Sequence, residues 1–484
     1  MKRLWFTLFA LLSTPCAGFD RAVWQDDFAY LKKQLESRYA NLAWFGSAQS
    51  GVDARALDRR ATRALGAAGD DADAKAAIAD FINGFGDGHL SIMPALAPKD
   101  DVPAPPNRDL HGADAATACA ALGYASTRSV PFSLPFESLA DFSMVSDGVS
   151  KPFRAGIVAG PGLKIGLIRI KYFRQRDYPS VCENVWSKAA QEGKTDDLAA
   201  VRDRIDDAWY AALADQLKQL RAANPDVLIV DVGGNGGGND AGEWTPRMFT
   251  DKPVHSARLL VTATPSLPGY LDEEIDGLRE VSKGDGVRGS ELVAKALADF
   301  ERRKRMIGDR GCDLSYAWRE QRPWQPFGCS RLLDAGFASG AVDYLAPGTI
   351  PDAKREAAVY WPSKVDAYRG AWTGPVYVLT DARSFSASEM FTAVMRDNAI
   401  ARTVGVKTGG AGCGFMHEDP PVELPHSHLR VRVPSCVRLR ADGTDEVAGV
   451  KPDLEIAPRE GEDDRTRAAR AIAAVAADLH TLTK

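Results

Sequence analysis

The chain has 484 residues and a formal net charge of −5, with 45% hydrophobic and 26% charged residues. This composition is that of a globular protein and argues against an intrinsically disordered chain. The length allows two or three domains that each bury a core. Because the net charge is negative and no long basic run occurs, nucleic acid is not an expected partner.

The first eighteen residues have the pattern of a secretory signal peptide. Lys2 and Arg3 give a positive start, residues 4–12 form a short apolar run, and residues 13–18 are mostly small. We expect cleavage near residue 17 or 18 and export to the periplasm or the extracellular space. The apolar run is about half the length of a bilayer crossing, which disfavours a membrane anchor, and no later segment is apolar enough to span a membrane.

The number of cysteines agrees with export. Six remain after the predicted cleavage, and in an oxidising compartment they can form three disulfides. Sequence proximity predicts the pairs Cys312–Cys329 and Cys413–Cys436, with Cys119–Cys182 as the remaining pair. Buried free thiols are the alternative. No Cys-x-x-Cys pair or Cys/His cluster has the spacing of a zinc site.

Two helices are predicted near the start of the mature chain. Apolar residues recur at helical spacing from Trp24 to Tyr39, and a second apolar face runs over 73–85. Glycines end the second helix just before His89. The proline-rich stretch 94–106 predicts an extended linker. We assign residues 19–110 to an N-terminal helical domain that includes this linker.

Apolar runs then alternate with helical patterns. The predicted strands cover 163–170, 227–232, 376–379 and 403–406, and the predicted helices run around 209–220 and over 387–395. A continuous apolar run such as 227–232 is typical of a strand buried on both faces of a mostly parallel sheet. The order of strand, helix and strand therefore predicts an α/β core with crossover helices, built from residues 111–265 and 362–460.

Two further segments complete the predicted organisation. Residues 266–361 are rich in charge and helix formers and then loop-like, which predicts a helical and loop insertion that could form a lid. Residues 461–484 include an alanine-rich stretch that predicts a C-terminal surface helix.

A glycine-rich segment follows the predicted strand 227–232. It reads Asp231-Val-Gly-Gly-Asn-Gly-Gly-Gly238 and can expose backbone N–H groups to an anion at the carboxyl end of a sheet. It matches neither the dinucleotide fingerprint nor a Walker loop. Taken alone, a plain tight loop explains it equally well.

A serine motif lies between a predicted strand and a predicted helix, from Ser384 to Glu389. The hydroxyl of Ser386 would lie at the positive end of a helix, where developing negative charge is stabilised. Ser386 and Glu389 also have the S-x-x-E spacing of a capping box, which alone would explain both residues. The two roles are compatible.

A histidine follows the second predicted helix, in Gly86-Asp-Gly-His89. A lone histidine is more often structural than catalytic, so His89 is a candidate base only in combination with the other motifs. His417 is a second candidate, because it is the histidine nearest in sequence to the serine motif.

Together these motifs resemble the C-terminal processing (tail-specific) peptidase family, with its tricorn protease and interphotoreceptor retinoid-binding protein relatives. The resemblance covers roughly 81–91, 164–263 and 371–456, and ends on Gly449-Val-Lys-Pro-Asp453. It implies a ClpP/crotonase-like core and Ser386 as the nucleophile. It also implies an oxyanion hole made by the N–H groups of Ala387 and of Gly236 or Gly237.

The sequence departs from the family pattern at several positions. Ala411 stands between two glycines where the family places its lysine base, and Phe415 replaces the usual glutamine. Gly233 replaces the usual arginine before the Gly-Asn pair, and no PDZ pattern occurs between 112 and 162. A Ser-Lys dyad and binding of chain ends are therefore not expected, although Lys407 is a possible displaced lysine.

The tricorn branch implies a substitute for the missing lysine. Its histidine comes from the N-terminal helical region and its glutamate from just before the terminal motif, and these places hold His89 and Glu446. Serine, histidine and a carboxylate form a complete acyl-transfer set that needs no metal or cofactor. We expect an exported serine peptidase acting on peptide or protein substrates. The alternatives are an inactive binding protein of the same fold and an esterase.

Overall fold

The computed structural model describes residues 19–94, 110–124, 130–283, 289–307, 312–328, 331–416 and 419–482. The predicted signal peptide lies outside these ranges, as do most of the proline-rich linker, Cys329 and His417.

A seven-stranded sheet forms the centre of the molecule, in the order β13-β9-β8-β5-β4-β3-β2. Five neighbouring strands are parallel: β13 (Leu454–Glu455), β9 (Arg402–Gly405), β8 (Val376–Thr380), β5 (Val227–Asp231) and β4 (Leu163–Arg169). An antiparallel hairpin of β3 (Arg154–Gly160) and β2 (Phe142–Asp147) extends the sheet beyond β4. The predicted α/β fold with a mostly parallel sheet is confirmed, while the hairpin was not predicted.

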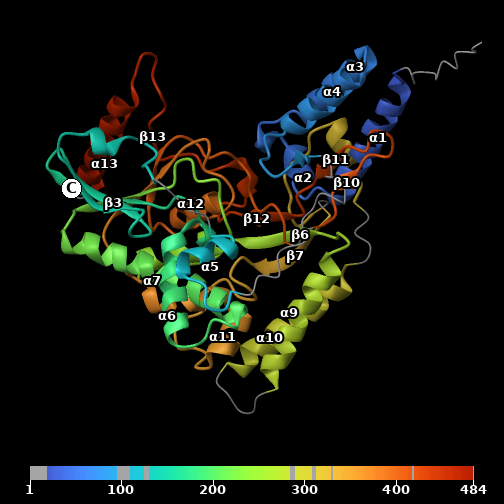
Figure 1. The fold of residues 1–484 in the computed structure, drawn as a ribbon. Coiled ribbons are helices and arrows are strands. Elements are labelled where there is room, and N and C mark those ends of the chain that lie inside the picture. Colours follow the sequence, from blue (N-terminus) through green and yellow to red (C-terminus); the bar gives the residue numbers. More distant parts are fainter. Residues whose placement is uncertain are drawn as a thin grey trace, which may run out of the picture.

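Helices cover both faces of this sheet, which explains why every residue of β5 is buried. One face carries α5 (Ala115–Ala121), α6 (Pro179–Gln191), α7 (Leu198–Ala222) and α12 (Ala387–Asp397). The other face is covered by α13 (Asp464–Leu482), whose Ala471, Ile472 and Val475 are buried against it (Figure 1). The C-terminal helix is therefore part of the core packing.

A second sheet joins the insertion to the C-terminal part of the core. Its antiparallel strands are β12 (Cys436–Leu439), β6 (Arg258–Thr262) and β7 (Leu332–Phe337). The helices α9 (Leu267–Ser282), α10 (Ser290–Arg305) and α11 (Ala353–Val359) pack against it. The three helices and β7 thus share one hydrophobic core with β6 and β12, whereas Leu314 and Trp318 pack in the core of the N-terminal helices.

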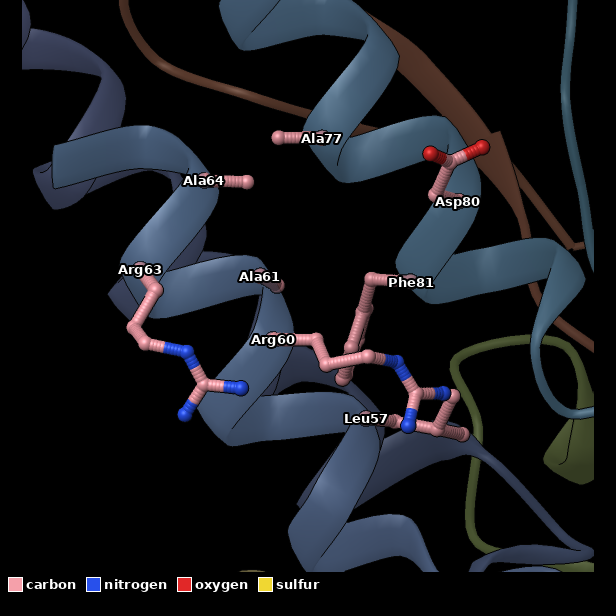
Figure 2. A pocket seen from close by; sticks show the side chains of 8 residues that line it. All are labelled: Leu57, Arg60, Ala61, Arg63, Ala64, Ala77, Asp80 and Phe81. Carbon is pink, nitrogen blue, oxygen red and sulfur yellow. The ribbon is translucent and has the colours of Figure 1, made fainter. Parts of the chain in front are cut away.

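The N-terminal helices form a separate core. They are α1 (Arg21–Arg38), α2 (Leu42–Phe45), α3 (Ala54–Ala67) and α4 (Asp71–Asn83). A small antiparallel sheet of β1 (Ser91–Ile92), β11 (Arg430–Arg432) and β10 (Val422–Glu423) links this unit to the C-terminal half. A hollow of about 350 Å³ lies between α3 and α4, with Arg60, Arg63 and Phe81 around it, and none of the predicted site residues lines it (Figure 2).

Short elements fill the connections. They are α8 (Ala241–Trp244) and the 3-10 helices at Ala48–Ser50, Phe136–Ser138, Gln175–Asp177, Thr245–Phe249, Leu314–Trp318, Trp361–Tyr368 and Glu446–Ala448. Among the described residues, no helix combines the length and apolarity that a membrane crossing requires.

Two of the three predicted disulfides are confirmed. Cys119 and Cys182 join α5 to α6, and Cys413 and Cys436 join the segment after Ala411 to β12. The third pair includes Cys329, which lies outside the described residues.

Candidate active site

Ser386 lies in the turn between β8 and α12, and it is the accessible serine of its motif. It is partly exposed and has a φ of +53°, a strained conformation for a residue with a side chain. Ser384 and Ser388 are fully buried, and their hydroxyls donate to the carbonyls of Val232 (2.9 Å) and Asn235 (2.8 Å). The neighbouring hydroxyls therefore hold the turn, and Ser386 is presented at its surface.

The glycine loop packs directly against this turn. A Cβ on Gly237 would lie 2.7 Å from Cβ of Ser386, and the φ of Gly237 is +107°. Only glycine fits this position without displacing the serine. The N–H of Phe385 donates to the carbonyl of Asn235 (3.0 Å), which fastens the two loops together.

Two backbone N–H groups beside Ser386 are free to bind an oxyanion. Within the described part of the chain, the N–H groups of Ala387 and Gly236 have no acceptor. The N–H of Gly237, by contrast, donates to Oδ1 of Asn235 (2.8 Å). Of the two glycines named by the resemblance, Gly236 is therefore the one with an available donor.

The glycine loop is held by an arginine that the sequence reading missed. Arg169, at the end of β4, donates to the carbonyls of Asp231 (2.9 Å) and Gly233 (2.5 Å) and is almost fully buried. Its guanidinium also pairs with the carboxylate of Asp231 (3.1 Å). The arginine absent at position 233 thus has a counterpart on the neighbouring strand. A charged residue inside a predicted buried strand was the signal that could have revealed it.

His89 reaches the same region from the N-terminal unit. Its Nδ1 lies 2.7 Å from the carbonyl oxygen of Ala411. Because a carbonyl only accepts, Nδ1 of the neutral ring carries the proton and Nε2 is left as a base. The N–H of Gly88 donates to the carbonyl of Gly410 (3.2 Å), and a Cβ on Gly88 would lie 3.2 Å from the ring of Phe385. The histidine loop therefore packs beside the residue that precedes Ser386. No hydrogen bond joins these two described residues, Ser386 and His89.

A buried carboxylate anchors the histidine loop. Asp87 accepts from the N–H of His89 (2.9 Å), the hydroxyl of Tyr39 (2.8 Å) and the amide of Asn41 (2.9 Å). Burial raises the pKa of Asp87, and the positive charge of a protonated His89 opposes that shift. The N-terminal helices thereby fix the backbone from which the imidazole projects.

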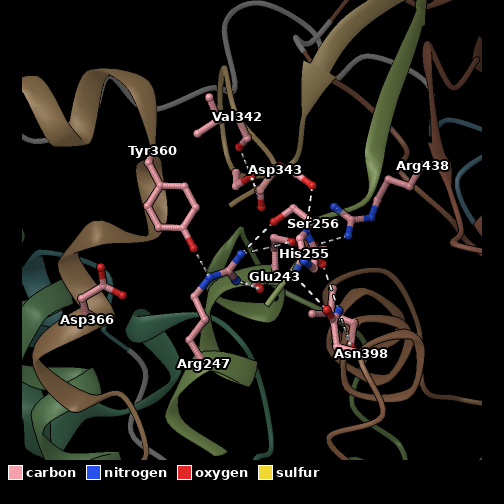
Figure 3. A network of polar contacts seen from close by, with 12 residues as sticks. Glu243, Arg247, His255, Ser256, Val342, Asp343, Tyr360, Asp366, Asn398 and Arg438 are labelled. Carbon is pink, nitrogen blue, oxygen red and sulfur yellow. Dashed lines mark hydrogen bonds and ion pairs between the residues drawn. The ribbon is translucent and has the colours of Figure 1, made fainter. Parts of the chain in front are cut away.

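Glu446 lies behind the site and differs in its contacts from the expectation. It is fully buried and accepts from Nε of Arg438 (3.0 Å). Arg438 also donates to Glu243, which accepts further contacts from Arg247 (Figure 3). The predicted orienting contact between Glu446 and His89 is not made, because Arg438 binds the carboxylate and the Ala411 carbonyl takes Nδ1. Burial raises the pKa of Glu446, and Arg438 opposes that shift.

The alternative bases are placed differently. Lys407 is exposed just after β9, and a Cβ on Gly449 would lie 2.9 Å from its Cε. His417 lies outside the described residues.

A hollow opens close to the turn that carries Ser386. It measures about 320 Å³ and lies at the carboxyl ends of β8 and β9. Apolar side chains of Leu134, Leu379 and Ile456 line it together with Asp381 and Arg383. Ligands of open α/β sheets bind at this edge of the strands.

Comparison with known proteins supports the resemblance described above. Residues 279–456, which hold Ser386, Ala411 and Glu446, match the model of peptidase family S41. The match confirms the resemblance to the C-terminal processing peptidases and supports a serine peptidase. It does not include His89 or the glycine loop, whose positions beside Ser386 come from the geometry above.

Solved structures resemble this chain over nearly its whole length. Mature CPAF complexed with lactacystin covers 95% of this chain and 99% of its own, at 17% identity and a TM-score of 0.51. Mature CPAF in a second structure covers 93% and 96%, at 15% identity and a TM-score of 0.50. At these identities the likeness concerns the fold.

A sequence relative matches a shorter stretch. An uncharacterized protein of Chlamydia muridarum (strain MoPn / Nigg) is 36% identical over 95 residues, 18% of this chain. The stretch spans 14% of that protein's own length.

Proposed function

We propose that this chain is an exported serine peptidase that hydrolyses peptide or protein substrates through an acyl-enzyme on Ser386. The observation that supports it most is the convergence of three distant segments at one turn. A partly exposed serine, two free N–H groups and a histidine with its Nε2 unprotonated lie together there. These are the nucleophile, the oxyanion hole and the base of acyl transfer.

In the proposed reaction, Oγ of Ser386 attacks the substrate carbonyl carbon while Nε2 of His89 takes the hydroxyl proton. The N–H groups of Ala387 and Gly236 bind the oxyanion. His89 then gives the proton to the leaving amine as the C–N bond breaks. Water, deprotonated by His89, attacks the ester, and His89 returns the proton to Oγ of Ser386 as the acyl C–O bond breaks and the acid is released. The hydrogen bond between Ser386 and His89 forms when substrate is bound, since catalytic contacts often tighten only then.

The proposal replaces the Ser-Lys dyad by serine and histidine, on a core of the ClpP/crotonase-like type. In this proposal the carbonyl of Ala411 orients the imidazole. Glu446 is a buried charged residue behind the site and does not contact His89. The hollow lined by Leu379 and Arg383 is proposed to take a substrate side chain, because it adjoins the nucleophile turn. The two disulfides are consistent with the proposed export to an oxidising compartment.

Labelling by a fluorophosphonate probe tests the proposal. The purified protein should label and cleave a peptide, Ser386→Ala should do neither, and Ser388→Ala should still label because its hydroxyl only holds the turn. Equal labelling of Ser386→Ala and wild type would contradict the assignment. Hydrolysis of esters without peptides would indicate an esterase, and no labelling of folded wild type would indicate a binding protein. Lactacystin, present in the CPAF structure, is a second probe for the same serine.

A further inference from the structure

The carboxylate of Glu389 accepts four hydrogen bonds from two segments around the site, the turn at Ser386 and the stretch from Thr408 to Ala411. Oε1 accepts from the hydroxyl of Thr408 (2.6 Å) and the N–H of Gly410 (2.7 Å). Oε2 accepts from the N–H of Ala411 (2.7 Å) and the N–H of Ser386 (3.1 Å). The side chain is fully buried. A helix cap explains only the bond to Ser386, because the other three donors lie outside α12.

We infer that Glu389 is a positioning residue of the proposed reaction, which holds the nucleophile turn and the loop that orients His89 in one arrangement. The inference rests on the proposed function. Ala411 is the link: its N–H donates to Glu389, and its carbonyl accepts from Nδ1 of His89 (2.7 Å). Without the contact to Glu389, the backbone of Ala411 is no longer held in place, and neither is the carbonyl that accepts from His89.

The contacts require an ionised carboxylate. Three of the four donors are backbone N–H groups, which cannot reverse their roles. The fourth, the hydroxyl of Thr408, already accepts from the N–H of Val450 (2.7 Å). A glutamine in its place would set its NH2 group against at least one of these N–H groups, and a protonated Glu389 could give its proton only to Thr408.

Protonation competes with this arrangement near neutral pH. Burial raises the pKa of Glu389 to about 7, against the bonds from Thr408, Gly410 and Ala411. The charged group that faces it is Glu446, whose negative charge acts in the same direction as burial. Glu389 should thus need to be ionised for full activity.

Glu389→Gln tests the inference, with Asp27→Asn as the matched control. Asp27 is also a fully buried carboxylate that accepts two backbone N–H groups of a distant loop, from His426 (2.9 Å) and Ser427 (2.8 Å), but it lies in the N-terminal unit. We expect kcat of Glu389→Gln to fall about 100-fold, as for a misplacement of about 1 Å, with little change in KM. The acid limb of its pH profile should become shallower, because the ionisation of Glu389 is lost. Asp27→Asn should keep both the rate and the profile of wild type.

Nitrogen NMR of the His89 imidazole gives a readout that does not depend on activity. Wild type should show a protonated, hydrogen-bonded Nδ1, and Glu389→Gln should lose that signal while remaining folded. If Glu389→Gln does not fold, Glu389→Asp, which keeps the charge with a shorter reach, should weaken the same signal and the rate to a lesser degree. An unchanged rate and an unchanged Nδ1 signal in a folded variant would overturn the inference, as would an equal loss in Asp27→Asn. If wild type were inactive, the proposed function would fail, and the Nδ1 signal would still decide the role of Glu389.

Discussion

Replacing Gly414 by alanine should disable the site by displacing the proposed base. A Cβ at this position would lie 2.8 Å from Cε1 and Nδ1 of His89. Carbon atoms pack at about 3.5 Å or more, so the ring must move by about 0.7 Å. That movement breaks the 2.7 Å contact with the carbonyl of Ala411. Since a misplacement of about 1 Å can cost about 100-fold in rate, we expect kcat to fall roughly 10- to 100-fold.

Gly414→Ala should lose little free energy of unfolding although it loses most of its activity, because the displaced imidazole is the end of a side chain. Gly414 has a φ of +77°, where an alanine costs about 1–2 kcal/mol. Gly461→Ala is the matched control: its φ is +72°, and no atom lies within 4 Å of the added Cβ. Peptide hydrolysis and urea unfolding should show similar losses of stability in both variants, with loss of rate in Gly414→Ala alone. Full activity of folded Gly414→Ala, or an equal loss in Gly461→Ala, would refute the reasoning.

Three further predictions concern other parts of the molecule. His89→Ala should reduce turnover by orders of magnitude and Lys407→Ala should change it little; steady-state kinetics with the reverse result would make the lysine the base. Replacing Cys413 and Cys436 together by alanine should lower the free energy of unfolding by about 3 kcal/mol, because the bridge spans 23 positions, and an unchanged denaturation midpoint would contradict this. Burial and the charge of Glu273 raise the pKa of Glu274 from 4.5 to about 7. The stability that comes with a neutral Glu274 side chain is present in full below about pH 4.5 and is lost as the pH rises through 7. The free energy of unfolding of Glu274→Gln should therefore exceed that of wild type by about 1–3 kcal/mol at pH 8 and not at pH 4. The same difference at both pH values would contradict this prediction.

Much of the central sheet was predictable from local pattern. The apolar runs at 163–170, 227–232, 376–379 and 403–406 correspond to β4, β5, β8 and β9 within a residue or two. Strands buried on both faces leave a continuous apolar signature, and the helices between them leave a helical one. The edge strand β2 of the hairpin leaves no such signature, because Phe142 and Met144 are not buried.

The sequence predicted which residues lie around the candidate site and did not predict which contacts they make. Ser386 stands at the predicted strand-to-helix turn, and Gly237 and His89 belong to the segments that surround it. The contacts made by Glu446 could not be predicted from the sequence, because they depend on which buried charged side chain lies within contact distance in the folded protein. Arg438 does so from β12, a strand whose pairing with β6 has no local signal. The same holds for Arg169, whose partner Asp231 lies 62 positions away.

The hydrogen bond between His89 and Ala411 joins residues that are 322 positions apart. The base therefore acquires its tautomer only after the segment around Ala411 has been synthesised and has docked against the N-terminal helices. A nascent or cleaved chain that lacks this segment holds a histidine with no fixed orientation. For a peptidase that is exported as proposed, this means that a chain whose distant segments have not yet docked lacks an oriented base.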